Sequence, residues 1–234
     1  AGVLLSTFQN RRWDSDFRTL QTLVAAGALG DVRRLESRFE RWRPELGGGW
    51  RERNDPGQAG GLLFDLGSHL VDQALVLLGP VRSVFAEVER RRSEDAADDD
   101  VFVSLEHVSG ARSHLWASAV APMLGPRFRV LGSSAGYVSY GLDGQEDALR
   151  SGARPGPGWG EVPPDRWGVL GTDDDHTPVA SLPGDYPAFY VGIARALTDG
   201  ADPPVDPRDS VRGLEVLEAA RRSALANEVV VLPV

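Results

Sequence analysis

Apolar residues at the start of the chain predict a strand followed by a helix. Val3 to Phe8 is a short apolar run typical of a buried strand, and Ser15 to Ala26 carries its apolar residues on one helical face. Ser15 or Asp16 would cap this helix, and Gly27 would end it. A strand followed by a helix is the last part of an α/β unit, whose beginning would precede residue 1.

The pattern then changes to a period of two, which is typical of antiparallel strands. From Asp31 to Trp42, the residues that share one face are Leu35, Ser37, Phe39 and Arg41. A helix is predicted at about 61–78, and short alternating segments follow at 81–90, 101–107, 112–120, 128–132 and 136–140. Because these segments are consecutive and joined by short turns, they predict an antiparallel meander. Helices at 186–199 and 207–225 and a strand at 229–232 complete the pattern.

Two segments between these elements are predicted as loops. Asp98 to Asp100 is interpreted as a solvated hairpin turn. Residues 141–184, rich in Gly and Pro, are predicted as a functional or mobile loop, in which Trp159 and Trp167 would cover a ligand or anchor the chain. Together the elements predict an α+β fold, with a large, mostly antiparallel open sheet and helices packed on one face.

The composition excludes several kinds of chemistry. The 234 residues include 25 basic and 34 acidic side chains, and the formal net charge of −9 argues against binding to nucleic acid. Neither Cys nor Lys occurs, which excludes disulfides, thiolate metal sites, Schiff-base catalysis and a P-loop lysine. No apolar stretch would span a membrane and no signal peptide is recognisable, so we expect a cytoplasmic location without membrane contact.

One predicted helix carries side chains suited to acid–base chemistry. Asp65, His69 and Asp72 recur at i, i+4 and i+7 and therefore share one face. A carboxylate one turn before an imidazole can orient the ring and raise its pKa toward neutrality. Gly67 lies in the same helix, where glycine costs about 1 kcal/mol relative to alanine and indicates a packing or functional reason. The alternative is an exposed ion pair without a catalytic role.

Motifs along nearly the whole chain resemble those of one enzyme family. The glycines, carboxylates and histidine of Gly60 to Asp72 resemble the substrate-domain signature of the glucose–fructose oxidoreductase / inositol dehydrogenase / rhizopine-catabolism (Gfo/Idh/MocA) family. Gln9 to Asp14 resembles the end of that family's Rossmann domain, in the branch of scyllo-inositol dehydrogenases. The later segments that fit the family are Gly184 to Tyr190, Gly200 to Val205 and Ala219 to Ser223.

The resemblance implies an oxidoreductase that uses NAD or NADP and moves hydride to or from a hydroxyl carbon of a sugar or cyclitol. By this resemblance His69 would be the acid–base residue, and Asp65 would bind substrate or tune His69. The further residues expected to bind substrate are Asn10, Arg11, Trp13, Asp72 and Tyr186, of which Asn10 and Arg11 are also candidates for cofactor binding. The open sheet would form the interface of a homodimer or homotetramer.

Two features of the family are missing from the sequence. It contains no Gly-x-Gly-x-x-Gly turn for the cofactor phosphates and no Glu-Lys-Pro with the family's catalytic lysine. We therefore expect residues 1–30 to be a remnant of a truncated Rossmann domain and residues 31–234 to be the substrate-binding and oligomerisation domain. Such a chain would be inactive alone and would not bind the cofactor tightly, the full-length parent being the enzyme. A non-catalytic module that associates through its sheet is the alternative.

No metal site is predicted. Asp173 to His176 are consecutive and lie in a predicted loop, so they are interpreted as a solvated turn. His107 and His114 are interpreted as residues of the sheet. A metal-dependent isomerase or hydrolase that used Asp65, His69 and His176 would require a bound ion.

Overall fold

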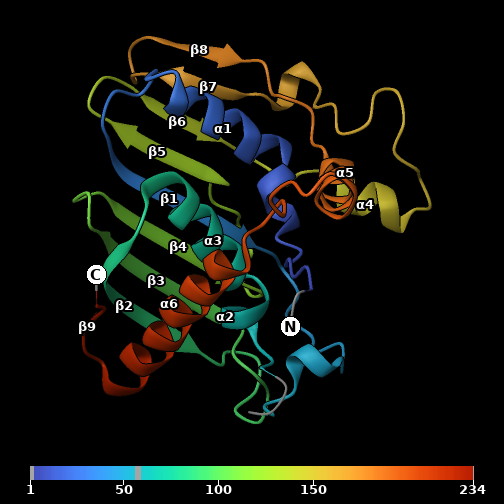
Figure 1. The fold of residues 1–234 in the computed structure, drawn as a ribbon. Coiled ribbons are helices and arrows are strands. Elements are labelled where there is room, and N and C mark those ends of the chain that lie inside the picture. Colours follow the sequence, from blue (N-terminus) through green and yellow to red (C-terminus); the bar gives the residue numbers. More distant parts are fainter. Residues whose placement is uncertain (1–2, 56–58, 234) are drawn as a thin grey trace.

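The computed structural model describes residues 3–55 and 59–233, and their strands form one sheet (Figure 1). The strand order is β8-β7-β6-β5-β1-β4-β3-β2-β9, and every neighbouring pair is antiparallel except β1 and β4. The strands are β1 (Val32–Glu40), β2 (Val81–Glu89), β3 (Asp100–His107), β4 (Arg112–Ser118), β5 (Phe128–Gly132), β6 (Gly136–Ser139), β7 (Gly168–Gly171), β8 (His176–Val179) and β9 (Val230–Val231). The predicted α+β class is confirmed.

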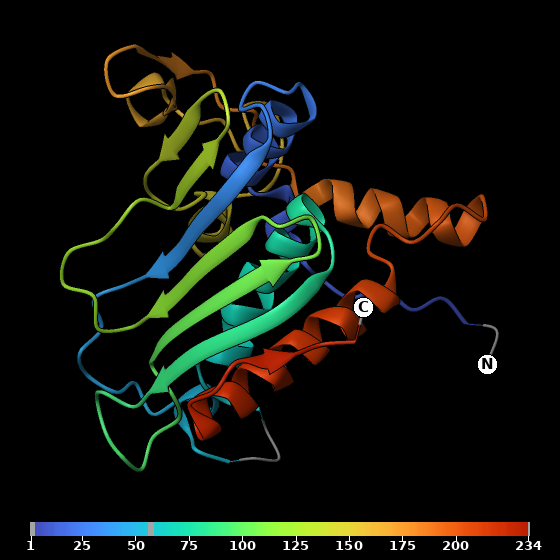
Figure 2. The same ribbon diagram turned by 90° about the vertical axis from the view of Figure 1, so that its left-hand side faces the viewer.

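Helices α1, α3 and α6 cover one face of the sheet, and the opposite face is bare (Figures 1 and 2). The helices are α1 (Ser15–Ala25), α2 (Leu62–Asp65), α3 (Gly67–Leu78), α4 (Gln145–Arg150), α5 (Tyr186–Thr198) and α6 (Pro207–Ala226), with 3-10 turns η1 (Asn10–Trp13), η2 (Trp50–Glu52) and η3 (Pro164–Arg166). Phe17 of α1, Leu70 of α3 and Leu217 of α6 belong to one buried cluster with the covered face. Within the described ranges, no helix is long and apolar enough to cross a membrane.

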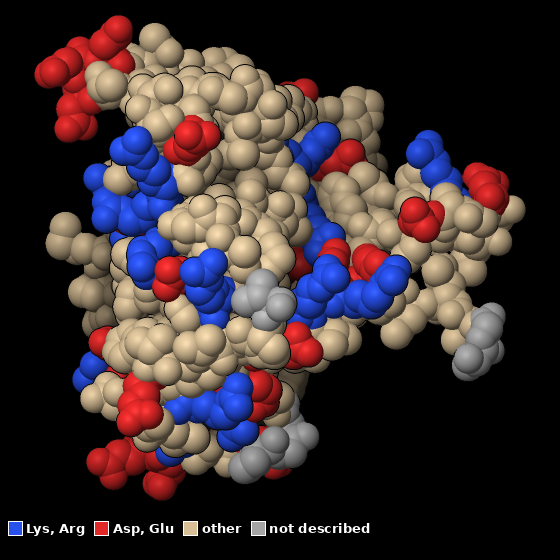
Figure 3. Space-filling view, turned by 60° about the vertical axis from the view of Figure 1, so that its left-hand side comes forward, with Lys and Arg blue, Asp and Glu red and all other residues tan. Residues whose placement is uncertain are grey.

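Burial alternates along the strands, as their period of two predicts. In β3, Val101, Val103 and Leu105 are buried, whereas Phe102 and Ser104 on the bare face are only half-buried. The bare face carries charges of both signs, including ion pairs from Glu36 to three arginines. Figure 3, which brings this side forward, shows arginines and acidic residues interspersed over it, rather than a surface of one sign.

The first predicted strand does not form. Residues 3–9 have no regular secondary structure, and Val3 and Leu5 are 77% and 62% exposed. The segment instead runs toward the start of α6, where the Ser6 hydroxyl donates a hydrogen bond to the carbonyl of Val205 (2.9 Å). An apolar run needs a neighbouring strand, and the described residues provide none beside it. The division of the chain at residue 30 stays a prediction, although α1 packs on the sheet.

The sheet is also not a simple meander. β1 lies between β4 and β5, so these two consecutive strands are separated, and β1 pairs in parallel with β4. Residues 141–184 are not a plain loop either, because they contain α4, η3, β7 and β8. β7 and β8 each have four residues and extend the sheet at one edge. Strands this short give too few positions for a period to be recognised.

Two local predictions need correction. The helix expected at 61–78 is interrupted at Leu66, which separates α2 from α3. The acidic run at 98–100 is not solvated: Asp99 is fully buried and accepts hydrogen bonds from the backbone of Arg91 and Arg92. Asp98 accepts from the backbone N–H of Leu63 (2.7 Å) and so fixes the start of α2. A charge pattern does not predict these contacts, because Leu63 is distant in the sequence and Arg91 and Arg92 lie on the other side of a turn.

Candidate functional site

Four segments bring polar side chains together beside the start of α3. Gln9 precedes η1, Arg11 lies in it, Arg41 follows β1, His69 lies in α3 and Glu146 lies in α4. Arg11 forms an ion pair with Glu146, and His69 contacts Gln9. Arg11 and Glu146 both act electrostatically on His69 and on Arg41, which places the charges close together. We call these five residues the His69 cluster.

The imidazole of His69 is held in one orientation. Its Nδ1 lies 2.8 Å from Oε1 of Gln9, and since a carbonyl oxygen can only accept, Nδ1 carries the hydrogen. The pKa of His69 is lowered to about 4, first by burial and then by the positive charges of Arg11 and Arg127, while Glu146 acts in the opposite direction. His69 is therefore neutral at pH 7, with the Nε2 lone pair able to accept a proton.

The predicted pairing of Asp65 with His69 was wrong. The structure gives Asp65 an ion pair with Arg51 instead (3.0 Å), and its side chain is 37% exposed. The pKa of His69 accordingly falls rather than rises toward neutrality. The interruption at Leu66 removes the regular helical register on which the prediction depended. Gln9, which is distant in sequence, takes the place expected for the carboxylate.

Asp72 has a different environment from the other two residues of its predicted stripe. Its two oxygens accept hydrogen bonds from Nε and Nη2 of Arg12, at 2.8 and 2.7 Å. Arg12 also pairs with Asp209 of α6 (3.2 Å). Burial raises the pKa of Asp72, and the Arg12 contacts act against that rise. The bidentate pair joins η1 to α3 and supports His69 one turn away.

Arg11 and Tyr186 meet inside the protein rather than at a surface. Both are about 5% exposed or less. The Tyr186 hydroxyl donates to Oδ1 of Asp14 (2.8 Å) and accepts from Nη1 of Arg11 (3.0 Å). Burial, with Asp16 nearby, raises the pKa of Asp14 well above its usual range. These contacts hold the Arg11 guanidinium toward Glu146. Arg11 and Tyr186 therefore support the site from the protein interior.

Asn10 and Trp13 were the other residues expected to contact a ligand. In the described part of the chain the Asn10 side chain has no hydrogen-bond partner, and it is half-buried. The Trp13 ring packs edge-on against Phe189 of α5 (5.6 Å between centroids). Trp159 donates from Nε1 to Gln145 (2.8 Å) and thereby anchors the segment that carries α4. Asn10 is thus free to bind a ligand, whereas Trp13 and Trp159 already contact other side chains. Ligand binding by Asn10 and Trp13 stays a prediction.

Sequence reasoning missed Gln9, Arg41 and Glu146 as members of the site. The alternating pattern placed Arg41 on the same face as Phe39, which is the face that the helices cover. The sequence therefore already indicated that the Arg41 side chain lies on the helix side of the sheet. Arg41 is half-buried, and among the described residues no carboxylate lies within 4.0 Å of it. Burial and the neighbouring Arg43 lower its pKa. The sequence did not point to Glu146, because its helix α4 lies in the segment predicted as a loop.

Comparison with known proteins assigns the family. Residues 17–138 match the family model described as "GFO/IDH/MocA C-terminal domain". The chain belongs to the GFO/IDH/MocA family. It is 36% identical over 236 residues to the scyllo-inositol 2-dehydrogenase (NADP(+)) IolW of Bacillus subtilis, covering 99% of this chain and 65% of that protein. It is 38% identical over 228 residues to the uncharacterized oxidoreductase YdgJ of Escherichia coli, covering 95% of this chain and 64% of that protein.

The solved structures of GFO/IDH/MocA oxidoreductases share this fold. The yvaA structure from Bacillus subtilis superposes with a TM-score of 0.92 at 34% identity, covering 99% of this chain and 67% of that one. The present chain therefore spans about two thirds of the length of the relatives that it matches.

The residues around α1 do not fit the phosphates of the family's dinucleotide cofactor. A pyrophosphate needs free backbone N–H groups at a helix N-terminus. Here the N–H of Ser15 already donates to Asp143 (2.8 Å) and that of Phe17 to Asp16 (2.6 Å). With Asp14 beside them, three carboxylates surround this helix start and would repel a phosphate. The start of α1 is therefore not suited to bind a phosphate.

The remaining histidines lie outside the site. His107 is buried in β3, where it contacts the carbonyl of Gly79 (2.9 Å) and the hydroxyl of Ser113 (2.7 Å). His114 lies in β4 on the bare face, so the interpretation of both as sheet residues is confirmed. The run from Asp173 to His176 is exposed, as expected of a solvated turn. Among the residues the structure describes, no group of three His, Cys, Asp or Glu could hold a metal ion.

Proposed function

We propose that this chain forms the substrate-binding part of an NAD(P)-dependent oxidoreductase that acts on a secondary hydroxyl of a cyclitol or sugar. The observation that carries the proposal is the neutral His69, whose Nδ1 is fixed by Gln9 and whose Nε2 can accept a proton. Family membership and the similarity to a scyllo-inositol 2-dehydrogenase support the substrate class. By itself the chain would be inactive.

His69 would take the proton of the reacting hydroxyl. When an alcohol is oxidised to a ketone, the O–H bond breaks and its proton must leave the oxygen, while hydride would pass from the carbon to NAD(P)+. The carbonyl oxygen that forms is strongly acidic while it still carries the proton. A base whose pKa is about 4 therefore suffices to accept it at that stage. The proton acceptor is Nε2, because Nδ1 already carries hydrogen.

Arg41 and Asn10 would orient the substrate. A guanidinium presents several N–H donors in a plane, which suits adjacent hydroxyl oxygens on a ring. Arg41 is half-buried and has no acidic partner in the described ranges. The free-energy cost of burying its charge is therefore not offset until the hydroxyl oxygens of a substrate bind to it. The unpaired amide of Asn10 can both donate and accept. Asp65, which pairs with the exposed Arg51, would contact substrate at the rim of the site.

Self-association through the bare face of the sheet is a second proposal. Phe102, His114 and Trp116 form one ring cluster there, with centroids 5.1 to 6.2 Å apart, and Arg38 stacks on Trp116 at 3.9 Å. An open sheet face with half-buried aromatic rings is suited to a second copy of the chain. The chain would then serve in assembly as well as in substrate binding.

The test uses the whole protein that contains this chain. Reduction of NAD+ and of NADP+ would be followed spectroscopically with inositols and common aldoses as substrates. We expect turnover with a cyclitol or sugar, and a loss of about 10²–10⁴-fold in kcat for His69→Ala. His176→Ala, at the exposed start of β8, is the matched control and should retain full activity. Full activity of His69→Ala would instead favour a non-catalytic role for this chain.

A further inference from the structure

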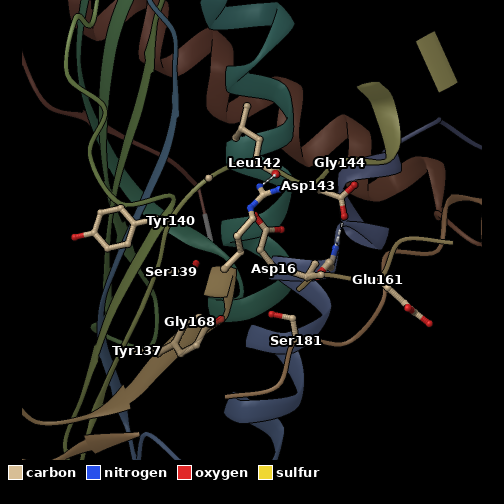
Figure 4. A pocket seen from close by; sticks show the side chains of 14 residues that line it. Asp16, Tyr137, Ser139, Tyr140, Leu142, Asp143, Gly144, Glu161, Gly168 and Ser181 are labelled. Carbon is tan, nitrogen blue, oxygen red and sulfur yellow. Dashed lines mark hydrogen bonds between the residues drawn. The ribbon is translucent and has the colours of Figure 1, made fainter. Parts of the chain in front are cut away.

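A small cavity lies beside the segment that precedes α4. It has a volume of about 60 Å³ and lies between the start of α1, strands β6 and β7, and residues 141–144 (Figure 4). Its polar walls come from Ser15, Asp16, Tyr137, Ser139 and Asp143. Glu161 and Arg166 are exposed at its mouth. None of the residues of the His69 cluster lines this cavity.

Three hydroxyl groups in the wall are buried and have no hydrogen-bond partner in the protein. They belong to Ser15, Tyr137 and Ser139, which are 2%, 1% and 5% exposed. Ser139 lies close enough to affect the pKa of Tyr137, which burial raises to about 12, but no hydrogen bond of ordinary geometry joins them. Leaving a buried polar group unpaired costs about 1–3 kcal/mol, so three around one cavity indicate a polar occupant.

The charges around the cavity favour a neutral occupant. Asp16, Asp143 and Glu161 would repel an anion. Asp16 forms an ion pair with Arg127, at 3.1 Å from Nε to Oδ2 but without hydrogen-bond geometry, and both oxygens of Asp143 accept backbone N–H groups. A cation would therefore find carboxylates that are already engaged, beside the buried guanidinium of Arg127. Groups that both donate and accept hydrogen bonds match hydroxyl walls of the same kind.

The size of the cavity limits the occupant further. A water needs about 10–15 Å³ of such space, so a cavity of about 60 Å³ holds roughly four to six waters or one molecule of similar extent. We propose that this cavity is a binding site for a short polyol with about three carbons, whose hydroxyls pair with Ser15, Tyr137 and Ser139. A cyclitol or hexose ring, the proposed substrate class, would be too large for it.

A molecule bound in this cavity would also affect the His69 cluster. Asp143 lines the cavity and bonds to the backbone of Ser15 and of Gln145, the residue before Glu146. A molecule bound here therefore contacts the segment that holds Glu146 against Arg11. The proposal does not depend on the proposed oxidoreductase activity, because binding is measured directly.

The experiment is saturation-transfer NMR with glycerol as the probe, on protein prepared without polyols. Tyr137→Phe removes one buried hydroxyl and keeps the ring. Tyr140→Phe is the matched control: Tyr140 also lines the cavity, but its side chain is 64% exposed and its hydroxyl points away from the cavity (Figure 4). We expect glycerol to bind at roughly millimolar concentration. The affinity should fall about tenfold in Tyr137→Phe and stay unchanged in Tyr140→Phe.

A second variant tests the position of the bound molecule without removing a hydroxyl. A methyl group added at Gly168 would overlap the Tyr137 hydroxyl, so Gly168→Ala should displace Tyr137 and abolish saturation transfer. Circular dichroism would establish that each variant is folded. Absence of glycerol binding to the unmodified protein, or equal affinity in Tyr137→Phe and Tyr140→Phe, would overturn the proposal and leave a cavity filled by water.

Discussion

His69 and Gln9 form a pair in which the amide oxygen determines the tautomer of the imidazole. The 2.8 Å contact between Nδ1 and Oε1 leaves Nε2 unprotonated, and the lowered pKa keeps the ring neutral at physiological pH. A glutamine achieves this without adding a charge. A carboxylate in the same place would stabilise the imidazolium and raise the pKa of His69.

Replacing Gln9 should therefore change the titration of His69 in a direction that depends on the charge introduced. In Gln9→Glu we expect the pKa of His69 to rise from about 4 toward its usual value near 6.5. In Gln9→Leu the tautomer is no longer fixed, and kcat of the whole protein should fall about tenfold. NMR titration of the imidazole Cε1–H measures the first effect, with exposed His176 as the internal reference. An unchanged midpoint in Gln9→Glu would contradict the role assigned to Gln9.

The stability contributed by His69 should depend on pH. Its pKa is about 4 in the folded protein and near 6.5 in the unfolded chain, so the unfolded chain binds a proton first as the pH falls. The contribution is fully present above pH 6.5 and is lost as the pH falls through 4. Relative to His69→Gln, which does not titrate, the protein should lose about 3 kcal/mol of unfolding free energy over that window. Urea denaturation at pH 7 and pH 4 gives the difference; parallel curves for the two proteins would refute it.

The buried Arg127 should be important for stability. Its side chain is 1% exposed, pairs with Asp16, and donates from Nη2 to Gln73 (2.8 Å). Its guanidinium also lies 4.0 Å from the Phe39 ring centroid. Arg127→Met leaves Asp16 buried without its partner, so we expect a loss of about 3–5 kcal/mol in chemical denaturation.

Arg208→Met is the control for that substitution. Arg208 also pairs with an aspartate, but its side chain is 82% exposed. Its replacement should leave the unfolding free energy nearly unchanged, because an exposed ion pair contributes little. Equal effects of the two substitutions would show that burial does not set the strength of the Arg127 pair.

The bare face of the sheet should mediate self-association. Trp116→Ala removes the ring on which Arg38 stacks and which contacts Phe102. We expect this variant to weaken association by about 2 kcal/mol or more, which sedimentation equilibrium detects as a shift toward monomer. Trp50→Ala is the matched control, because Trp50 lies in η2 and is 47% exposed. A protein that is monomeric before substitution would exclude this interface.

The main helices and strands could be predicted from the sequence, because each is specified by residues close together in the chain. The helices at 15–25, 186–198 and 207–226 and the strands from 81 to 139 form close to the predicted bounds. Asp185 and Asp206 cap α5 and α6 through their own side chains, as such residues do at helix starts. Each of these features depends on residues within a few positions of one another.

What failed were predictions that required a partner from elsewhere in the chain. The acidic run at 98–100 is an instance: Gly61, before α2, has a φ of +94°, and a side chain there would overlap Asp98. The glycine therefore has a packing reason, and the same contact leaves Asp98 only half-buried, although the charge pattern alone assigns it to solvent. The placement of Gln9 and Glu146 beside His69 likewise depends on tertiary packing of η1 and α4.

The insertion of β1 into the middle of the sheet has a consequence for how the chain folds. β1 pairs on one side with β4 and on the other with β5, both of which are synthesised long after it. Contacts between such distant segments form slowly, whereas β2, β3 and β4 can assemble early as local hairpins. Until β1 docks, β4 and β5 each expose an unpaired edge inside the future sheet, where another chain could add. Aggregation during synthesis or refolding should therefore begin at these two strands.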